Sequence, residues 1–327
     1  MIVCSDIHAH KYRAFNQDNR RLNNIISLIE DLYDAADGDD GYVLFCGDLF
    51  NNMQLIHTEV IDRVTEVFQK CTKKHPKVKW IMISGNHDYA TKNFIEKPAI
   101  SAVNALARVS DNVLVIDNGR YSGDDFVVHG VSYYDNPEHF KLALADVSKA
   151  AAKGQSGKSH YLLMHQTVGF ADLVPDDIDP RDPLFDPFDL VFNGHIHAHS
   201  VVNAKFINVG SPLHRDAGDI GKEKGVLLLD AKSGKFVRIV LDYPVYRKLD
   251  EGEEIPEEWK DDYIVWMPKQ IEVTIEEQEI AEKFDHNRVS RDELLSNYIK
   301  LKLDPENPKQ AKRIISYGKK LLSHVTI

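Results

Sequence analysis

Residues 78–88 read VKWIMISGNHD, a run of apolar side chains that ends in a cluster of polar ones. The run predicts a buried strand, and Gly85 permits a sharp turn that aims the side chains after it. Similar runs lead into polar clusters at residues 1–4, 42–46, 160–164 and 190–192. Because a rigid sheet holds groups that come from distant parts of a sequence, we expect one site at the ends of these strands.

The order of apolar patterns along the chain predicts the fold class. Apolar residues spaced by three and four predict helices around residues 22–33 and 60–68. Further short apolar runs predict strands at residues 113–116, 126–131, 206–209, 225–229 and 236–241. Strands alternate with helices early and follow other strands later, which indicates a mixed sheet assembly of the α/β sandwich kind.

Length and composition exclude several classes of protein. The 327 residues are 43% hydrophobic, enough to bury a core, so a disordered chain is excluded. Three cysteines argue against a disulfide scaffold and fit a reducing compartment. No apolar run approaches the ~20 residues that span a bilayer, and the opening MIVCSDIH leaves no room for a signal peptide. We therefore expect a cytoplasmic protein without membrane association.

The net charge of −11 would argue against nucleic acid as a partner, because phosphate-binding proteins usually carry excess Lys and Arg. The acidic excess is local, however, since residues 250–282 by themselves carry a net charge of −11. We expect a main domain of residues 1–242, a small acidic capping module of residues 243–285 and C-terminal helices within residues 286–327. The acidic run is more typical of a solvated face than of a binding surface.

The last part of the chain shows a strand pattern and then a helix pattern. Residues 263–267 and 271–275 predict two strands of the capping module. Ser290 and Glu293 form a capping box that opens one helix, and Pro308 suits the first turn of a second. The second helix has a narrow apolar seam, which fits either a self-packing pair of helices or a partner protein.

Five clusters carry the side chains that are able to bind metal: Asp6-Ile7-His8, Gly47-Asp48, Gly85-Asn86-His87-Asp88, His165 and Gly194-His195-Ile196-His197. In the first and last clusters, a spacing of two places both donors on one side of an extended segment. Seven mixed donors are too many for one tetrahedral zinc but suit two bridged ions, and imidazole favours Mn, Fe or Zn over Mg. Two ions ~3.5–4 Å apart promote displacement at phosphorus, so we expect phosphoester hydrolysis.

These five blocks, in this order over residues 1–215, resemble the calcineurin-like metallophosphoesterase family. The resemblance implies an α+β fold, a four-layer α/β/β/α sandwich with two central sheets. It implies two metal ions bridged by Asp48. One ion would be held by Asp6, His8 and His197, and the other by Asn86, His165 and His195. His87 would be the acid that protonates the leaving oxygen, and Asp88 would orient His87.

Within that family, G-D-L-F at residues 47–50, G-S-P at residues 210–212 and the appended C-terminal module resemble SbcD-type nuclease subunits of DNA recombination and repair complexes. The opening SDIHAHKYRAF is similar to bacteriophage exonuclease subunits. This branch implies a DNA exonuclease or endonuclease with two Mn²⁺ ions, Fe²⁺ and Zn²⁺ remaining open. It also implies a homodimer that works with an SbcC-type coiled-coil ATPase, in the cytoplasm of a bacterial cell or of a phage-infected host. By analogy, the helices of residues 286–327 would bind that ATPase.

Candidate substrate-binding residues flank the metal blocks: His10, Lys11, Arg13 and His199. A local structural role is equally open for the two histidines. The lysines of residues 70–79, with Arg20 and Arg21, would suit contacts to a phosphate backbone, but a solvated helix surface explains them equally well. Two functions are alternatives to a DNA nuclease. The first is a small-molecule or nucleotide phosphodiesterase, which would use the same site. The second is a scaffold with a decayed metal site, which is disfavoured because no ligand position is missing.

Overall fold

The structure is a computed structural model that describes residues 1–267, except 38–40, 52–54, 90–99, 155–156 and 170–177. Met1–Met267 form one compact unit, and the expected domain boundary at residues 242/243 falls inside it. The strand expected at residues 271–275 and the helices expected within residues 286–327 lie outside the described residues. Among the described helices, none is long and apolar enough to cross a bilayer.

The first large sheet is built around four parallel strands. Its order is β12 (Phe236–Val240), β11 (Gly225–Leu229), β1 (Ile2–Cys4), β2 (Tyr42–Phe45), β3 (Lys79–Met82) and β4 (Val113–Val115). Strands β1 to β4 run parallel, while β11 is antiparallel to both β1 and β12. Every residue of β1 and nearly every residue of β2 and β3 is buried, as expected for parallel strands covered on both faces.

The second large sheet repeats this plan with antiparallel edges. Its order is β5 (Arg120–Ser122), β6 (Phe126–Val131), β7 (Ser159–His165), β8 (Leu190–Gly194), β10 (Phe206–Asn208) and β9 (Ser200–Val201). Strands β6, β7, β8 and β10 are parallel, and the edge strands β5 and β9 are antiparallel to their neighbours. The register pairs His165, at the end of β7, with Gly194 at the end of β8.

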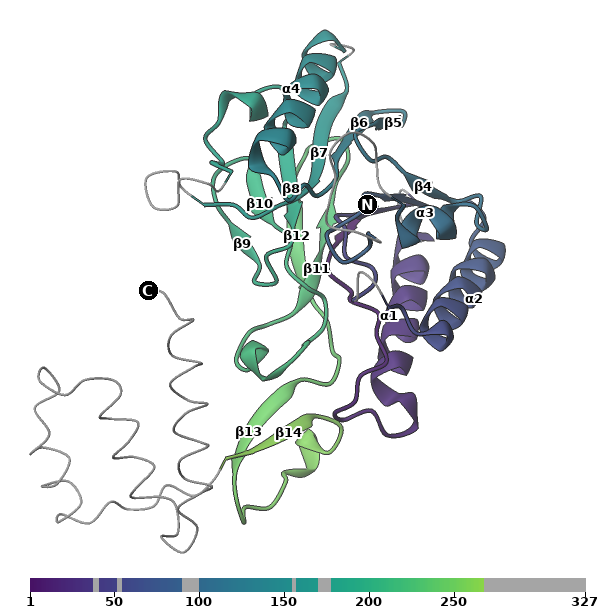
Figure 1. Cartoon of the computed structure of the whole chain (residues 1–327), viewed down its shortest axis with the longest axis vertical. Helices are drawn as coiled ribbons and strands as arrows, with labels where there is room; N and C mark the ends of the chain where they lie inside the picture. The colour runs from purple at the N-terminus through teal and green to yellow at the C-terminus, as the bar shows by residue number, and fades with distance from the viewer. Residues whose placement is uncertain (38–40, 52–54, 90–99, 155–156, 170–177, 268–327) are drawn as a thin grey trace, which may run out of the picture. The chain divides into compact units, whose positions relative to one another are not determined.

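Helices cover the outer face of each sheet (Figure 1). The first sheet is covered by α1 (Arg20–Asp37), α2 (Thr58–Lys74) and α3 (Ala102–Ala107), and the second by α4 (Pro137–Lys153). Short 3₁₀ turns occur at Gln17–Asn19, Pro183–Phe185, Ala217–Asp219 and Glu257–Trp259. Asn136 caps α4 by accepting a hydrogen bond from the Glu138 N–H, and Pro137 stands in the first turn where its missing N–H costs nothing.

Three buried clusters separate the layers. Side chains such as Leu44, Ile81 and Leu163 fill the space between the two sheets. Trp80 and Phe68 belong to the cluster beneath α1 and α2, while a third cluster lies beneath α4. The layers are therefore helix, sheet, sheet and helix, which confirms the four-layer sandwich.

The small sheet differs from expectation. β14 (Tyr263–Met267) is a strand as expected, but it pairs in parallel with β13 (Tyr246–Asp250). Among the described residues, the sequence patterns did not predict β5, β9, β13, α3 or α4. Strand β13 reads YRKLD, in which charged residues interrupt the apolar pattern.

Arg21 joins the small sheet to the sandwich. This side chain is 4% exposed, and its guanidinium carbon lies 3.4 Å from the centre of the Tyr12 ring. The same carbon lies 5.4 Å from the ring centre of Tyr246 on β13 and 5.0 Å from that of Tyr263 on β14. A buried cation stacked on three aromatic rings fixes the entry of α1 against the small sheet.

Candidate binuclear metal centre

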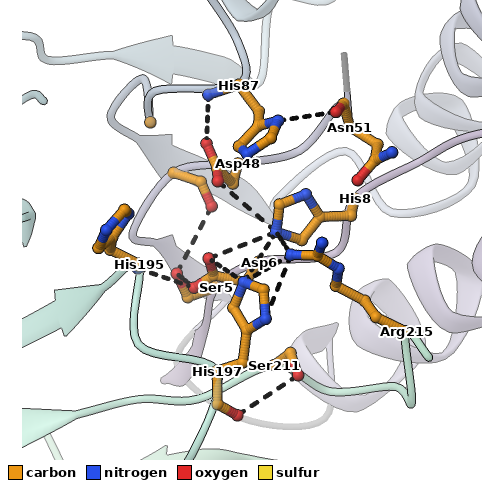
Figure 2. A network of polar contacts seen from close by, with 12 residues as sticks. Ser5, Asp6, His8, Asp48, Asn51, His87, His195, His197, Ser211 and Arg215 are labelled. Atoms are coloured by element: carbon orange, nitrogen blue, oxygen red, sulfur yellow. Dashed lines mark hydrogen bonds and ion pairs between the residues drawn. The ribbon is translucent and has the colours of Figure 1, made fainter. Parts of the chain in front are cut away.

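The structure brings all seven predicted ligands together at the ends of strands from both sheets. From the first sheet, Asp6 and His8 follow β1, Asp48 follows β2 and Asn86 follows β3; from the second, His165 ends β7, and His195 and His197 follow β8. Figure 2 shows the side chains of Asp6, His8 and His197 pointing toward one another, with Asp48 beside them. Segments separated by up to 191 residues of sequence meet here.

One donor set consists of Asp6, His8 and His197. The Nε2 atoms of His8 and His197 lie 3.1 Å apart, and Asp6 Oδ1 lies 3.6 Å and 3.5 Å from them. Such separations are those of donors that share one ion at about 2.0–2.2 Å. Asp6 Oδ1 is buried without a hydrogen-bond partner, as expected of an oxygen that is free to bind a cation.

The second donor set consists of Asn86, His165 and His195. Asn86 Oδ1 lies 3.0 Å from His165 Nε2 and 3.1 Å from His195 Nδ1. Asp48 Oδ2 connects the two sets, because it lies 3.4 Å from His165 Nε2 and 3.5 Å from His8 Nε2. Carboxylates and imidazoles with atoms close enough to hold an ion include the groups Asp6–His8–His197 and Asp6–Asp48–His165, so these residues would be able to hold divalent metal.

Four of the donors have left-handed backbone conformations. The φ angles of Asp6, His8, Asp48 and His195 are 55°, 51°, 59° and 71°. Each such conformation costs a non-glycine residue about 1–3 kcal/mol, and these conformations gather at functional sites. The expectation that the Asp6–His8 and His195–His197 pairs lie on extended segments is therefore wrong. Their side chains converge because the backbone turns sharply just beyond each strand.

Two glycines make the close packing of these loops possible. Gly47 has a φ of 92°, in the region that glycine adopts without strain. Gly85 is required for space, since a Cβ there would lie 2.3 Å from Asp48 Oδ1 and 2.8 Å from His165 Cε1. Any larger residue at position 85 would push against the bridging carboxylate.

Hydrogen bonds around the centre fix the ligand atoms. Ser5 Oγ donates to Asp6 Oδ2 at 2.6 Å, and the backbone N–H of His195 donates to the same oxygen at 3.1 Å. His165 Nδ1 donates to the Cys46 carbonyl at 2.7 Å, so Nε2 is the nitrogen that faces the centre. Cys46 therefore contributes a carbonyl, while burial raises the pKa of its thiol well above the usual value.

His87 and Asp88 have separate roles. His87 Nδ1 donates to the Asn51 carbonyl at 2.7 Å, and the His87 backbone N–H donates to Asp48 Oδ1 at 2.8 Å. Asp88 does not orient His87 as expected. Its carboxylate instead accepts the backbone N–H groups of Asp48, Gly85 and Phe50 at 2.8, 2.9 and 3.0 Å. Asp88 is 2% exposed and lies beneath the loops, where it holds their backbones in place.

The carboxylates of the centre stay ionised. Burial opposes the charge on Asp6, but the nearby imidazoles of His197 and His8 and the charge of His165 hold its pKa well below the usual value. Burial likewise opposes the charge on Asp48, and the charge of His165, helped by His8, lowers its pKa. Two buried negative charges therefore lie side by side, an arrangement that favours cation binding.

The imidazoles respond to opposing influences. Burial lowers the pKa of His195 to about 4, and the charge of His165 acts in the same direction. Burial also lowers the pKa of His8. At His165, burial is outweighed by the Asp48 carboxylate, which raises the pKa to about 9. His8 and His195 thus present neutral lone pairs, which is the form that binds metal, and an ion at His165 Nε2 would displace a proton.

The four candidate substrate-binding residues differ in their contacts and in their exposure to solvent. Lys11 Nζ lies 2.5 Å from Glu59 Oε2, so the charge of Lys11 is already paired. His10 packs edge-on against the ring of Tyr12, and His199 Nδ1 donates to the Val209 carbonyl at 3.3 Å. The Arg13 side chain is exposed. These contacts favour the structural interpretation of His10 and His199.

Several basic residues of α1 and α2 form ion pairs or hydrogen bonds with other residues of the fold. Lys70 pairs with Glu30 at 2.6 Å and Lys74 with Asp34 at 2.7 Å, both between the two helices. Arg20 donates to the Asp261 carbonyl at 2.6 Å. For these residues the structure favours an ion-paired helix surface over a phosphate-binding one.

Three residues beside the centre were not predicted from the sequence. Tyr133 stacks on His195 with ring centres 5.9 Å apart. Buried Lys224 donates to the His197 carbonyl at 3.1 Å, and Arg215 Nη1 reaches His8 and His197. Tyr133 stands just beyond β6, a position at which the end-of-strand pattern would have indicated it. No local motif marks Lys224 or Arg215, because only tertiary folding brings them to the site.

Residues 1–199 match the family model described as calcineurin-like phosphoesterase. This match covers more than half of the chain, so the protein belongs to the calcineurin-like phosphoesterase family. Members of this family are phosphoester hydrolases that typically use a binuclear metal centre, and the two donor sets are in keeping with that class.

Comparison with other proteins adds little beyond the family. No curated protein matches the chain significantly. Among solved structures, TT1561 of Thermus thermophilus is 12% identical with a TM-score of 0.44, covering 73% of this chain and 97% of that one. A hypothetical protein from the same organism is 14% identical with a TM-score of 0.34, covering 64% of this chain and 77% of that one.

Proposed function

We propose that this protein is a metal-dependent DNA nuclease subunit that hydrolyses phosphodiester bonds with two Mn²⁺ ions. The observation that carries the proposal is the position of Asp48 Oδ2, shared by two complete donor sets, with His87 beside them. Two ions held in this way would supply Lewis-acid activation of water and neutralise charge on the phosphate. The preference for DNA rests on the G-D-L-F and G-S-P blocks that resemble SbcD-type subunits.

The burial of the donors supports a substrate that approaches from one side. Asp6, His8, Asp48 and His165 are buried, whereas Asn86, His87 and His197 are half-buried. The centre is therefore partly open to solvent where Asn86, His87, His195 and His197 lie. A polymer lying across this opening would place one phosphate against the ions without entering a deep pocket.

His87 is the residue proposed to protonate the leaving oxygen. Its Nδ1 hydrogen is occupied by the Asn51 carbonyl, so Nε2 is the nitrogen left to exchange a proton with substrate. One of its ring nitrogens lies within 4.8 Å of donor atoms of His8 and Asp48. His87 would thus lie next to the ions, and we assign it the role of acid rather than of ligand by the family resemblance.

The proposal is tested with purified full-length protein, Mn²⁺ and end-labelled linear DNA in single- and double-stranded forms, with and without an SbcC-type ATPase. We expect Mn²⁺-dependent degradation that chelation abolishes. A protein that binds two Mn²⁺ and hydrolyses nucleotides or bis(4-nitrophenyl) phosphate, yet leaves every form of DNA intact, would be a small-molecule phosphodiesterase. Sedimentation of the protein alone and with the ATPase tests the proposed homodimer and the proposed complex.

Replacing His87 with Gln separates catalysis from metal binding. We expect bound Mn²⁺ to remain at two per chain while the hydrolysis rate falls by about 10²–10⁴-fold, because a general acid is lost. His139→Gln, on the outer helix α4, is the matched control and should keep the wild-type rate. Loss of metal together with activity in His87→Gln would instead make His87 a ligand.

A further inference from the structure

Arg215 reaches into the metal centre from a loop outside the five sequence blocks (Figure 2). Its Nη1 lies 2.9 Å from His197 Nε2 and 3.2 Å from His8 Nε2. Both imidazole nitrogens belong to the first donor set. A guanidinium group thus donates to the same lone pairs that a metal ion would use.

The backbone of Arg215 is held from two sides. Its N–H donates to Asp219 Oδ2 at 2.9 Å, and its carbonyl accepts Arg21 Nη2 at 2.6 Å. Asp219 in turn pairs with the buried Lys224 at 2.8 Å. Because the backbone is fixed, the side chain always starts from the same place, and the guanidinium has the centre within its reach.

Metal binding changes the energetics of this position. An ion bound to His8 and His197 takes their lone pairs, so Arg215 loses both acceptors. Its positive charge then stands close to a divalent cation, and such like charges repel strongly in a half-buried site. An anion between the two positive groups removes the repulsion, and the phosphate of the substrate is the anion that this site receives.

We propose that Arg215 is a substrate-binding residue that leaves His8 and His197 when metal binds and then grips a non-bridging oxygen of the substrate phosphate. The inference rests on the proposed hydrolysis of phosphodiesters at this centre and deepens it. The planar guanidinium offers two parallel N–H donors, which match two phosphate oxygens better than an ammonium group does. The same residue would therefore oppose metal binding in the free enzyme and favour it when phosphate is present.

The test measures binding as well as activity. Calorimetry would measure Mn²⁺ affinity of the wild type, Arg215→Gln and Arg215→Lys without phosphate, and inorganic phosphate affinity after loading with Mn²⁺. Hydrolysis of bis(4-nitrophenyl) phosphate and of DNA follows on the same samples. Arg63→Gln, which removes an arginine from the outer surface of α2, is the matched control. Circular dichroism establishes that each variant is folded.

For Arg215→Gln we expect phosphate binding to weaken by about tenfold or more, as when a charge-assisted hydrogen bond is lost. Mn²⁺ affinity without phosphate should rise, because a nearby positive charge is removed. Arg215→Lys should fall between the two, and Arg63→Gln should match the wild type. Phosphate affinity within about twofold of wild type in Arg215→Gln would overturn the inference, since a lost charged contact is worth more than that. Failure to cut DNA, with the phosphate effects present, would overturn the nuclease proposal alone.

Discussion

At the scale of the residue, the site is built by backbone conformations that the chain adopts only under constraint. Asp6, His8, Asp48 and His195 all have φ between 51° and 71°. The surrounding contacts hold them there, including the three backbone N–H groups that Asp88 accepts. The burial of Asp88 raises its pKa to about 8, against the lowering effect of those hydrogen bonds. The loops thus bring strained backbone and buried acidic groups together around the metal centre.

Replacing Gly85 with Ala tests how tightly the loops around the metal centre are packed. Its Cβ would stand 2.5 Å from the Asp48 backbone nitrogen, so the Asp48 loop must move. We expect the free energy of unfolding to fall by about 1–3 kcal/mol, as in other overpacked cores, together with weaker Mn²⁺ binding. Gly119→Ala is the control, because its Cβ would meet the Ile116 carbonyl oxygen at an ordinary 3.5 Å. Denaturant melts and metal titrations of both variants would show whether the clash is specific to the centre.

The donors of the site were predictable from sequence because each block combines a strand end with metal-binding side chains. The supporting contacts were not. The sequence places Asp88 beside His87, but the turn at Gly85 directs the Asp88 carboxylate to backbone N–H groups instead. Arg215 lies 18 residues beyond His197 and meets it only through the fold. The sequence shows which metal-binding and charged side chains are present near the strand ends. Which atoms each side chain contacts depends on the folded backbone and cannot be read from sequence spacing.

At the scale of the element, the apolar strands and the amphipathic helices α1 and α2 were recovered, whereas several short or polar elements and the 17-residue helix α4 were not. α1 and α2 have clear apolar stripes and begin and end within a few residues of their patterns. α3 has six residues, too few for a period to appear. β9 has two residues, both exposed, and is defined by its pairing with β10. Strand β9 exists because its neighbour β10 supplies its hydrogen bonds.

A pair of buried histidines on β6 and β7 makes one layer sensitive to pH. His129 Nε2 and His160 Nδ1 lie 3.1 Å apart. Burial lowers the pKa of His129 to about 4, and the charges of His160 and Arg120 act in the same direction. Because the unfolded pKa is 6.5, the unfolded chain takes up the proton first as the pH falls. The stability that neutral His129 provides is complete above about pH 6.5 and is lost between there and pH 4.

Replacing His129 with Gln should remove this titration. We expect the variant to be less stable than the wild type at pH 7.5 and the difference to shrink as the pH falls toward 4.5. Urea melts of both proteins at a series of pH values measure the effect, and other acid-sensitive groups cancel in the comparison. A difference that is constant across the series would mean that His129 does not titrate in this way.

At the scale of the whole molecule, the small β13–β14 sheet is joined to the sandwich through Arg21. This residue stacks on Tyr12, Tyr246 and Tyr263 and also supports the Arg215 carbonyl. Replacing Arg21 with Met should lower the free energy of unfolding by about 2–4 kcal/mol, because both a desolvated cation–π stack and a hydrogen bond are lost. Arg63→Met on α2 should change it by less than about 0.5 kcal/mol. Chemical denaturation of the two variants provides the measurement.

Each donor set contains residues that follow strands of both sheets. Asp6, His8 and Asn86 come from the edge of one sheet, and His165, His195 and His197 from the edge of the other. Each ion would therefore add a crosslink between layers that are already joined by apolar contacts and by hydrogen bonds such as His195 N–H to Asp6 Oδ2. Asp48 Oδ2 is common to both sets, so occupancy of one would alter the affinity of the other, and the effect must be reciprocal. Loading the centre and clamping the two halves of the sandwich are then a single cooperative event.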